Sequence, residues 1–106
     1  MDDPFSLKNK RALVTGGSSG LGPFIVRHLD AAGAAVSVHY HENQAGAESI
    51  AATLKNPTEV VQADLSETDA IIKLFEKSSP IDILVNCAAT ESQDVAELNL
   101  LSNDRW

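Results

Sequence analysis

The sequence predicts an α/β fold of three layers, in which a parallel sheet lies between helices on both faces. Short apolar runs alternate with segments of helical periodicity along the chain, a pattern typical of parallel strands joined by helical crossovers. Gly and Pro residues punctuate these segments. The runs at 11–16 and 81–86 are the most apolar, so we expect them to be central in a sheet of strand order 3-2-1-4.

The first strand is expected at 11–16, where β-branched residues end an apolar run. The first helix follows at about 20–32, and Gly33 is its expected C-terminal cap. Its apolar positions recur at helical spacing, at Leu21, Ile25 and Leu29. The second strand is expected at 34–40, another apolar run.

The second half of the pattern repeats this alternation. A helix is expected at about 43–55, ended by Pro57, and a short third strand at 59–63. The third helix is expected at about 67–77, and the fourth strand at 81–86. The helix faces expected to be buried are Ala47, Ile50, Ala51 and Leu54 in one, and Ile71, Leu74 and Phe75 in the other.

Two local signals are less regular. Ser66 followed by Asp69 resembles a capping box for the third helix, with Asp in place of the usual Glu or Gln. The tail at 92–106 gives no clear pattern and is expected to be helix or loop.

Length and charge limit the classes of function. We expect residues 1–106 to form one domain. The net charge of −7 and the pI of about 4.7 disfavour nucleic-acid binding, which relies on Lys and Arg. The single Cys87 excludes an intrachain disulfide and favours a reducing compartment. With no signal peptide and no apolar run long enough for a membrane span, we expect a cytoplasmic protein with no membrane contact.

The segment from 11 to 22 predicts a phosphate-binding turn. A strand runs into a turn of Gly and Ser and then into a helix, which places free amides and the helix N-terminus against an anion. Pro23 suits the first helical turn. Gly16 permits a tight turn, Gly20 leaves room for a pyrophosphate against the backbone, and Gly22 allows close packing of the helix. The candidate phosphate-binding residues are Gly16, Ser18, Ser19, Gly20, Leu21 and Gly22. The alternative is a plain strand-to-helix turn.

The spacing Thr-Gly-x-x-x-Gly-x-Gly at 15–22 resembles that of the short-chain dehydrogenases/reductases. The segment 7–17 is similar to the usual entry of that family into its first strand, and the resemblance covers nearly the whole chain. It implies a Rossmann-like half sheet that binds NAD(P)(H). It also implies hydride transfer between nicotinamide and an alcohol or carbonyl compound.

The resemblance implies further cofactor contacts. Asp64 and Leu65 match the place where the family binds the adenine amino group, although Asp64 could instead cap the third helix. The run 86–89, Asn-Cys-Ala-Ala, is similar to the family's Asn-Asn-Ala-Gly and implies that Asn86 and Ala88 lie beside the adenosine ribose. Cys87 and the residue at 89 depart from that pattern, and Cys87 is expected to be an unreactive thiol.

The end of the second strand bears on cofactor choice. NAD enzymes of this fold place an acidic residue there to bind the ribose 2′-OH. Tyr40 occupies this position, with Glu42 two residues on as a substitute. Ser19 and His41 stand where NADP-binding members often carry Arg or Lys. We expect Tyr40 and His41 to contact the cofactor, with NADP(H) favoured over NAD(H).

His39 and His41 are two residues apart on a strand and could face one metal ion. No third ligand is spaced to complete a site, so we expect no metal and interpret them as a polar strand end at the cofactor mouth.

No catalytic residue is expected in this chain. The family resemblance implies a Tyr and a Lys four residues later, but Tyr40 is the only tyrosine and residue 44 is Gln44. We therefore expect the cofactor-binding half of such an enzyme, truncated before the catalytic segment and inactive by itself. The alternatives are a non-catalytic dinucleotide-binding or regulatory module, and a fragment without an independent role. The strand at 81–86 is expected to leave an edge for self-association or a partner chain, and the substrate stays open.

Overall fold

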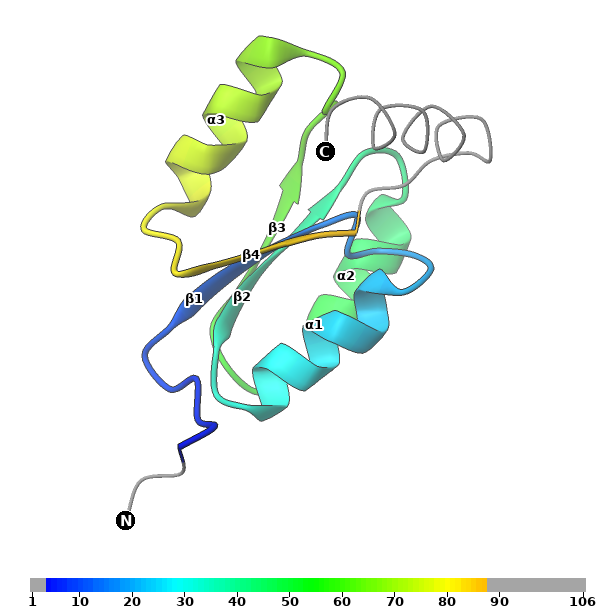
Figure 1. Ribbon diagram of the computed structural model, residues 1–106. Helices are drawn as coiled ribbons and strands as arrows, with labels where there is room; N and C mark the ends of the chain where they lie inside the picture. The colour runs from blue at the N-terminus through cyan, green and yellow to red at the C-terminus, as the bar shows by residue number, and fades with distance from the viewer. Residues whose placement is uncertain (1–3, 88–106) are drawn as a thin grey trace, which may run out of the picture.

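The computed structural model describes residues 4–87, in which strands and helices alternate as expected (Figure 1). The strands are β1 (Arg11–Thr15), β2 (Ala35–Tyr40), β3 (Thr58–Gln62) and β4 (Ile83–Asn86). The helices are α1 (Gly22–Ala31), α2 (Gln44–Ala51) and α3 (Thr68–Ser78). The expectation for the tail at 92–106 lies outside the described residues.

The strands form one parallel sheet in the order β3-β2-β1-β4, which confirms the expected topology. One detail of the expectation is wrong, because β2 and β1 are the interior strands. Among the described residues β4 pairs only with β1 and forms an edge, where Leu84 is 51% exposed. High apolar content therefore did not make β4 central within this part of the chain.

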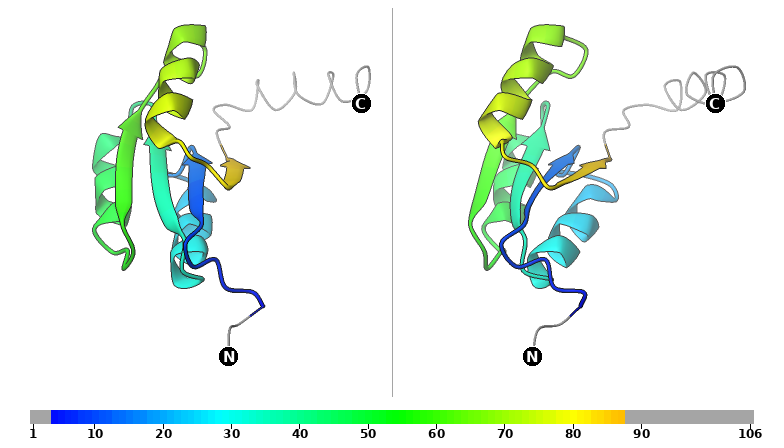
Figure 2. Two further views of the ribbon diagram at one scale, coloured as in Figure 1. Left: turned by 90° about the vertical axis from the view of Figure 1, so that its left-hand side faces the viewer. Right: turned by 60° about the vertical axis from the view of Figure 1, so that its left-hand side comes forward.

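Helices cover both faces of the sheet (Figures 1 and 2). α1 and α2 lie on one face, where Val26 and Ile50 pack against apolar side chains of β1 and β2. α3 lies on the other face, where Leu74 packs with Leu13 and Val61. The α3 face has the smaller buried cluster, and the expectation that Phe75 faces inward is wrong, because it is 37% exposed.

Helix α2 ends at Ala51, four residues before the expected end, for a reason that lies in α1. The buried carboxylate of Asp30 accepts hydrogen bonds from the backbone N–H groups of Lys55 and Asn56, at 2.9–3.1 Å. The Asn56 side chain also donates to the carbonyl of Asp30 at 2.7 Å. The segment before Pro57 therefore binds the C-terminal part of α1 and leaves the helix.

The first residues of β4 and α3 also differ from expectation. Strand β4 begins at Ile83, just after Asp82. The backbone N–H of Asp82 donates to the carbonyl of Arg11 at 2.8 Å, and the carboxylate of Asp82 accepts the N–H of Arg11 at 2.9 Å. Helix α3 has Glu67 at its N-cap with no side-chain cap, so the capping box expected from Ser66 is not formed.

Candidate functional site

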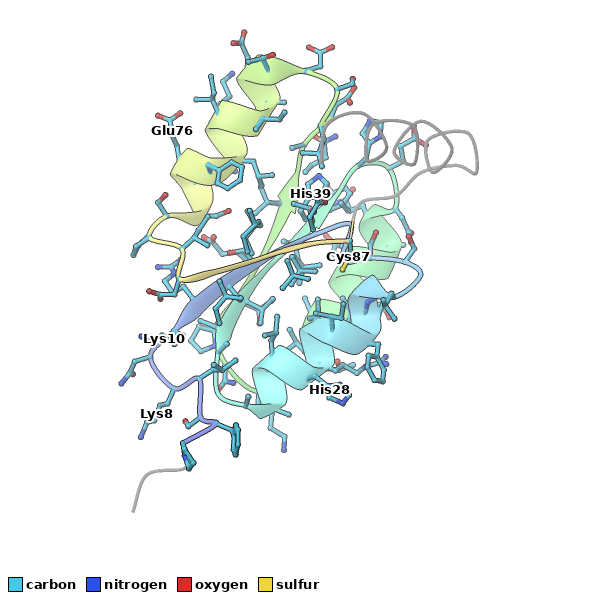
Figure 3. The ribbon with its side chains drawn as sticks, in the orientation of Figure 1. Lys8, Lys10, His28, His39, Glu76 and Cys87 are labelled. Carbon is cyan, nitrogen blue, oxygen red and sulfur yellow. The ribbon has the colours of Figure 1, made fainter. Side chains whose placement is uncertain are left out.

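The residues expected to bind a cofactor gather at one edge of the sheet. Because the strands are parallel, their carboxyl ends meet there, with Thr15 beside Asn86 and Tyr40 beside Gln62. In open parallel sheets this edge is where ligands bind. Figure 3 shows the labelled His39 and Cys87 at this same edge.

The glycine turn between β1 and α1 has the geometry that its sequence predicted. Gly16 and Gly20 have φ angles of +67° and +62°, in the left-handed region that favours glycine. A Cβ on Gly22 would overlap the carbonyl oxygen of Gly16 and lie 2.7 Å from the Cα of Gly17. The three glycines thus turn the chain twice and bring the start of α1 against the turn.

The outer side of this turn is open. Ser19, Gly20 and Leu21 are exposed, and a Cβ built on Gly20 meets no atom of the described chain within 4 Å. Helix α1 begins with Leu21 at its N-cap, without a side-chain cap and without an acidic residue in its first turn. A helix N-terminus with these features offers free amides and a positive dipole end to an anion.

Asn43 ties this turn to α2, a role that the sequence analysis did not assign. Its Oδ1 accepts the N–H of Gly46 at 3.0 Å, which caps the helix, and its Nδ2 donates to the carbonyl of Ser18 at 3.2 Å. A Cβ on Gly46 would lie 2.8 Å from the same Ser18 carbonyl oxygen. The Asn just before an apolar helical pattern was the available signal for the cap.

His39 lies beneath the turn, and the interpretation of it as a polar strand end at an open mouth is wrong. Its side chain is 2% exposed. Nδ1 accepts the N–H of Gly16 at 2.9 Å, and Nε2 donates to the carbonyl of Ala63 at 2.8 Å. Burial lowers the pKa of His39, because the cationic ring would lose its hydration.

A second missed contact joins the ends of β1 and β4. The buried hydroxyl of Thr15 donates to Oδ1 of Asn86 at 2.7 Å, and the N–H of Cys87 donates to the carbonyl of Thr15 at 2.9 Å. Asn86 is thereby oriented at the edge where the resemblance placed it. Cys87 is partly buried against the core on the α1 and α2 face.

Polar side chains line the edge beyond β2 and β3. Tyr40 is half-buried against the core, whereas His41 is exposed beyond it. Nε2 of His41 lies 3.7 Å from Oδ2 of Asp64, and its Nδ1 lies 4.0 Å from Oε1 of Glu42. His41 therefore lies between two carboxylates.

Asp64 closes a turn before α3. The hydroxyl and the N–H of Ser66 donate to its Oδ1 at 2.7 and 3.0 Å, and these two bonds lower the pKa of Asp64. Its carboxylate does not cap α3, so the alternative of a helix cap is wrong. Leu65 is partly buried against the core on the α3 face, and Ala88 lies outside the described residues.

The described part of the chain offers no candidate metal site, and it contains a hollow that does not include the glycine turn. Residues 4–87 contain no group of three or more His, Cys, Asp or Glu side chains that could hold a metal ion. A hollow of about 740 Å³ lies between β3 and α3, lined by Gln62 and Lys73 among others, and the glycine turn takes no part in it.

Comparison with known proteins identifies the family. A family model for short chain dehydrogenases matches residues 10–106. The chain belongs to the short-chain dehydrogenase/reductase family. The NADPH-dependent aldehyde reductase 2 (chloroplastic) of Arabidopsis thaliana is 36% identical over 104 residues, which cover 81% of this chain and 38% of that protein.

Solved structures of family members agree with the fold. The RhlG/NADP active-site complex of Pseudomonas aeruginosa superposes with a TM-score of 0.70 at 36% identity, covering 89% of this chain and 40% of that one. The blue fluorescent protein from a metagenomic library, in complex with NADPH, has a TM-score of 0.75 at 32% identity, covering 80% and 38%. The chain thus spans less than half the length of these relatives. Its described helices include none that is long and apolar enough to cross a membrane.

Proposed function

We propose that the chain binds NADP(H) at the carboxyl edge of its sheet, as the cofactor-binding part of a short-chain dehydrogenase/reductase. The open glycine turn at the uncapped start of α1 carries this proposal. Gly20 has a left-handed φ and open space where a Cβ would stand, so a pyrophosphate can approach the backbone. The residues at this edge therefore fit a dinucleotide.

Each predicted residue has a place in the proposed binding mode. The turn residues Gly16, Ser18, Ser19, Gly20, Leu21 and Gly22 would hold the pyrophosphate. Asp64 and Leu65 would lie at the adenine, and Asn86 would lie beside the adenosine ribose. Tyr40 and His41 would lie at the ribose 2′ position, and the presence of Tyr40 in place of an acidic residue at the end of β2 supports NADP(H) over NAD(H). The NADP and NADPH complexes among the relatives support the same preference.

The nicotinamide, when bound, supplies hydride transfer to or from an alcohol or carbonyl compound. The residues described here bind and orient the cofactor, and we assign no catalytic step to them. The sequence contains no Tyr-x-x-x-Lys, because Tyr40 is its only tyrosine. We therefore propose that this chain alone does not oxidise NADPH with a panel of ketones. We also propose that it acts in the cytoplasm.

Isothermal titration calorimetry with NADP⁺ and NAD⁺ tests the proposal. We expect measurable but weak binding, tighter for NADP⁺. Tyr40→Asp should shift the preference toward NAD⁺ by about tenfold or more, because a carboxylate repels the 2′-phosphate and accepts from a 2′-OH. Tyr40→Phe is the matched control, since it keeps the ring that packs against the core. A folded chain that gives no heat with either dinucleotide would overturn the proposal.

A further inference from the structure

The buried ring of His39 connects two segments that flank the proposed cofactor site. Its Nδ1 accepts the N–H of Gly16, the first residue of the glycine turn. Its Nε2 bonds to the carbonyl of Ala63, directly before Asp64. The backbone of His39 adds a third contact, because its carbonyl accepts the N–H of Gly17 at 2.9 Å. One residue of β2 thus holds the first two amides of the turn and the end of β3.

These hydrogen bonds define the protonation state of the ring. A backbone N–H can only donate, so Nδ1 must carry a lone pair. A carbonyl can only accept, so Nε2 must carry the proton. The ring is therefore the neutral Nε2–H tautomer. A second proton on Nδ1 would face the N–H of Gly16 with another donor, and the bond that holds the turn would be lost.

The surroundings favour the neutral ring. The side chain is 2% exposed, so a charge on it would lie away from water. His41, which directly follows β2, also disfavours a positive charge on His39. Asp64 after β3 and Glu42 after β2 are the carboxylates beside His41. On the α3 face of the sheet, Asp69 is the acidic residue of the first helical turn.

We propose that His39 is a positioning residue that makes cofactor affinity depend on pH: the neutral ring holds the glycine turn and the Asp64 segment in register, and protonation releases them. The inference rests on the proposed function, since it assigns dinucleotide binding to this edge. Because the bound cofactor would contact both segments, it would favour the neutral ring. Binding should therefore release a proton in mildly acidic solution.

The test compares NADP⁺ affinity at about pH 8 and about pH 5.5, either side of the ordinary histidine range. The measurement is made in His41→Asn and in the double variant with His39→Asn, so that the two proteins differ only at residue 39. Asn at position 39 places an acceptor near the Nδ1 position and cannot be protonated. We expect the affinity of His41→Asn to fall on acidification about twofold more than that of the double variant. The effect is modest because burial already lowers the pKa of His39 before the cofactor binds. Titration of the 2′-phosphate is common to both proteins and cancels.

Histidine ring ¹⁵N NMR gives an independent readout. We expect the Nε2–H tautomer of His39 at about pH 8 and, on acidification, coupled shifts of the Gly16 and Asp64 amide signals. Equal pH dependence in the two variants, or an Nδ1–H tautomer, would overturn the inference. If the chain binds no NADP⁺ at about pH 8, the proposed function fails. In that case the NMR measurements of the ring tautomer and of the coupled amide shifts still test whether His39 positions the turn.

Discussion

Substitution of Gly20 by Val is the sharpest perturbation of the proposed site. Gly20 has a φ of +62°, and a side chain there would project into the open space on the outer side of the turn. Two costs follow, one for folding and one for binding. The left-handed conformation costs an L-residue about 1–2 kcal/mol, which should appear as a loss of unfolding free energy.

The binding cost is larger, because the side chain occupies the approach to the turn amides. A hydrogen bond to a charged group contributes about 1.5–3 kcal/mol. Loss of two such bonds to a pyrophosphate therefore costs about 3 kcal/mol or more, which is at least about 100-fold in affinity. Because the proposed wild-type binding is already weak, Gly20→Val should bind no detectable NADP⁺ by calorimetry.

Gly33→Ala is the matched control. Gly33 also has a positive φ, of +111°, and it lies at the opposite end of α1 from the glycine turn. A Cβ on Gly33 would lie 3.0 Å from the backbone nitrogen of Lys8. We expect Gly33→Ala to lose stability in urea unfolding while the folded protein keeps its NADP⁺ affinity. The reasoning would be refuted if folded Gly20→Val bound NADP⁺ like wild type, or if folded Gly33→Ala lost binding to the same extent.

Three further predictions test other contacts. Asn43→Ala should lower the unfolding free energy by about 1 kcal/mol through loss of the α2 cap. Asn43→Asp should keep the cap and weaken only the hydrogen bond to the Ser18 carbonyl. Urea unfolding measures the loss of the cap, and NADP⁺ titration measures the loss of the bond to Ser18. Ser66→Ala should raise the pKa of Asp64 toward its ordinary value, as measured by carboxyl ¹³C NMR. Because the folded-state pKa of Asp64 is lowered, the stability from this group is present above the unfolded-state pKa and is lost as pH falls through the folded-state pKa. The variant should lose part of that contribution, since the backbone N–H of residue 66 still donates to Asp64. If the exposed β4 edge pairs between chains, Leu84→Lys should reduce self-association, as measured by light scattering. A wild-type protein that stays monomeric at high concentration would contradict that expectation.

The order of elements and the strand order could be predicted from the sequence, because periodicity and turn residues are local signals. The glycine turn was also predictable, since Gly16 and Gly20 adopt backbone conformations that other residues disfavour. Element ends were less predictable. Helix α2 stops early because Asp30 accepts the N–H groups of Lys55 and Asn56, which lie 25 and 26 residues further along the chain. No local sequence pattern indicates such a distant partner.

The roles of polar residues at the sheet edge depended most on tertiary structure. The sequence alone predicts that His39 is a polar strand-end residue beside His41, and that the two histidines could face one metal ion. Only the parallel pairing of β1, β2 and β3 brings Gly16 to one ring nitrogen and the Ala63 carbonyl to the other. The sequence by itself thus determined that a glycine turn with left-handed residues follows β1. Tertiary packing decided which buried group holds that turn, because hydrogen-bond partners 23 and 24 residues apart meet only when the strands align.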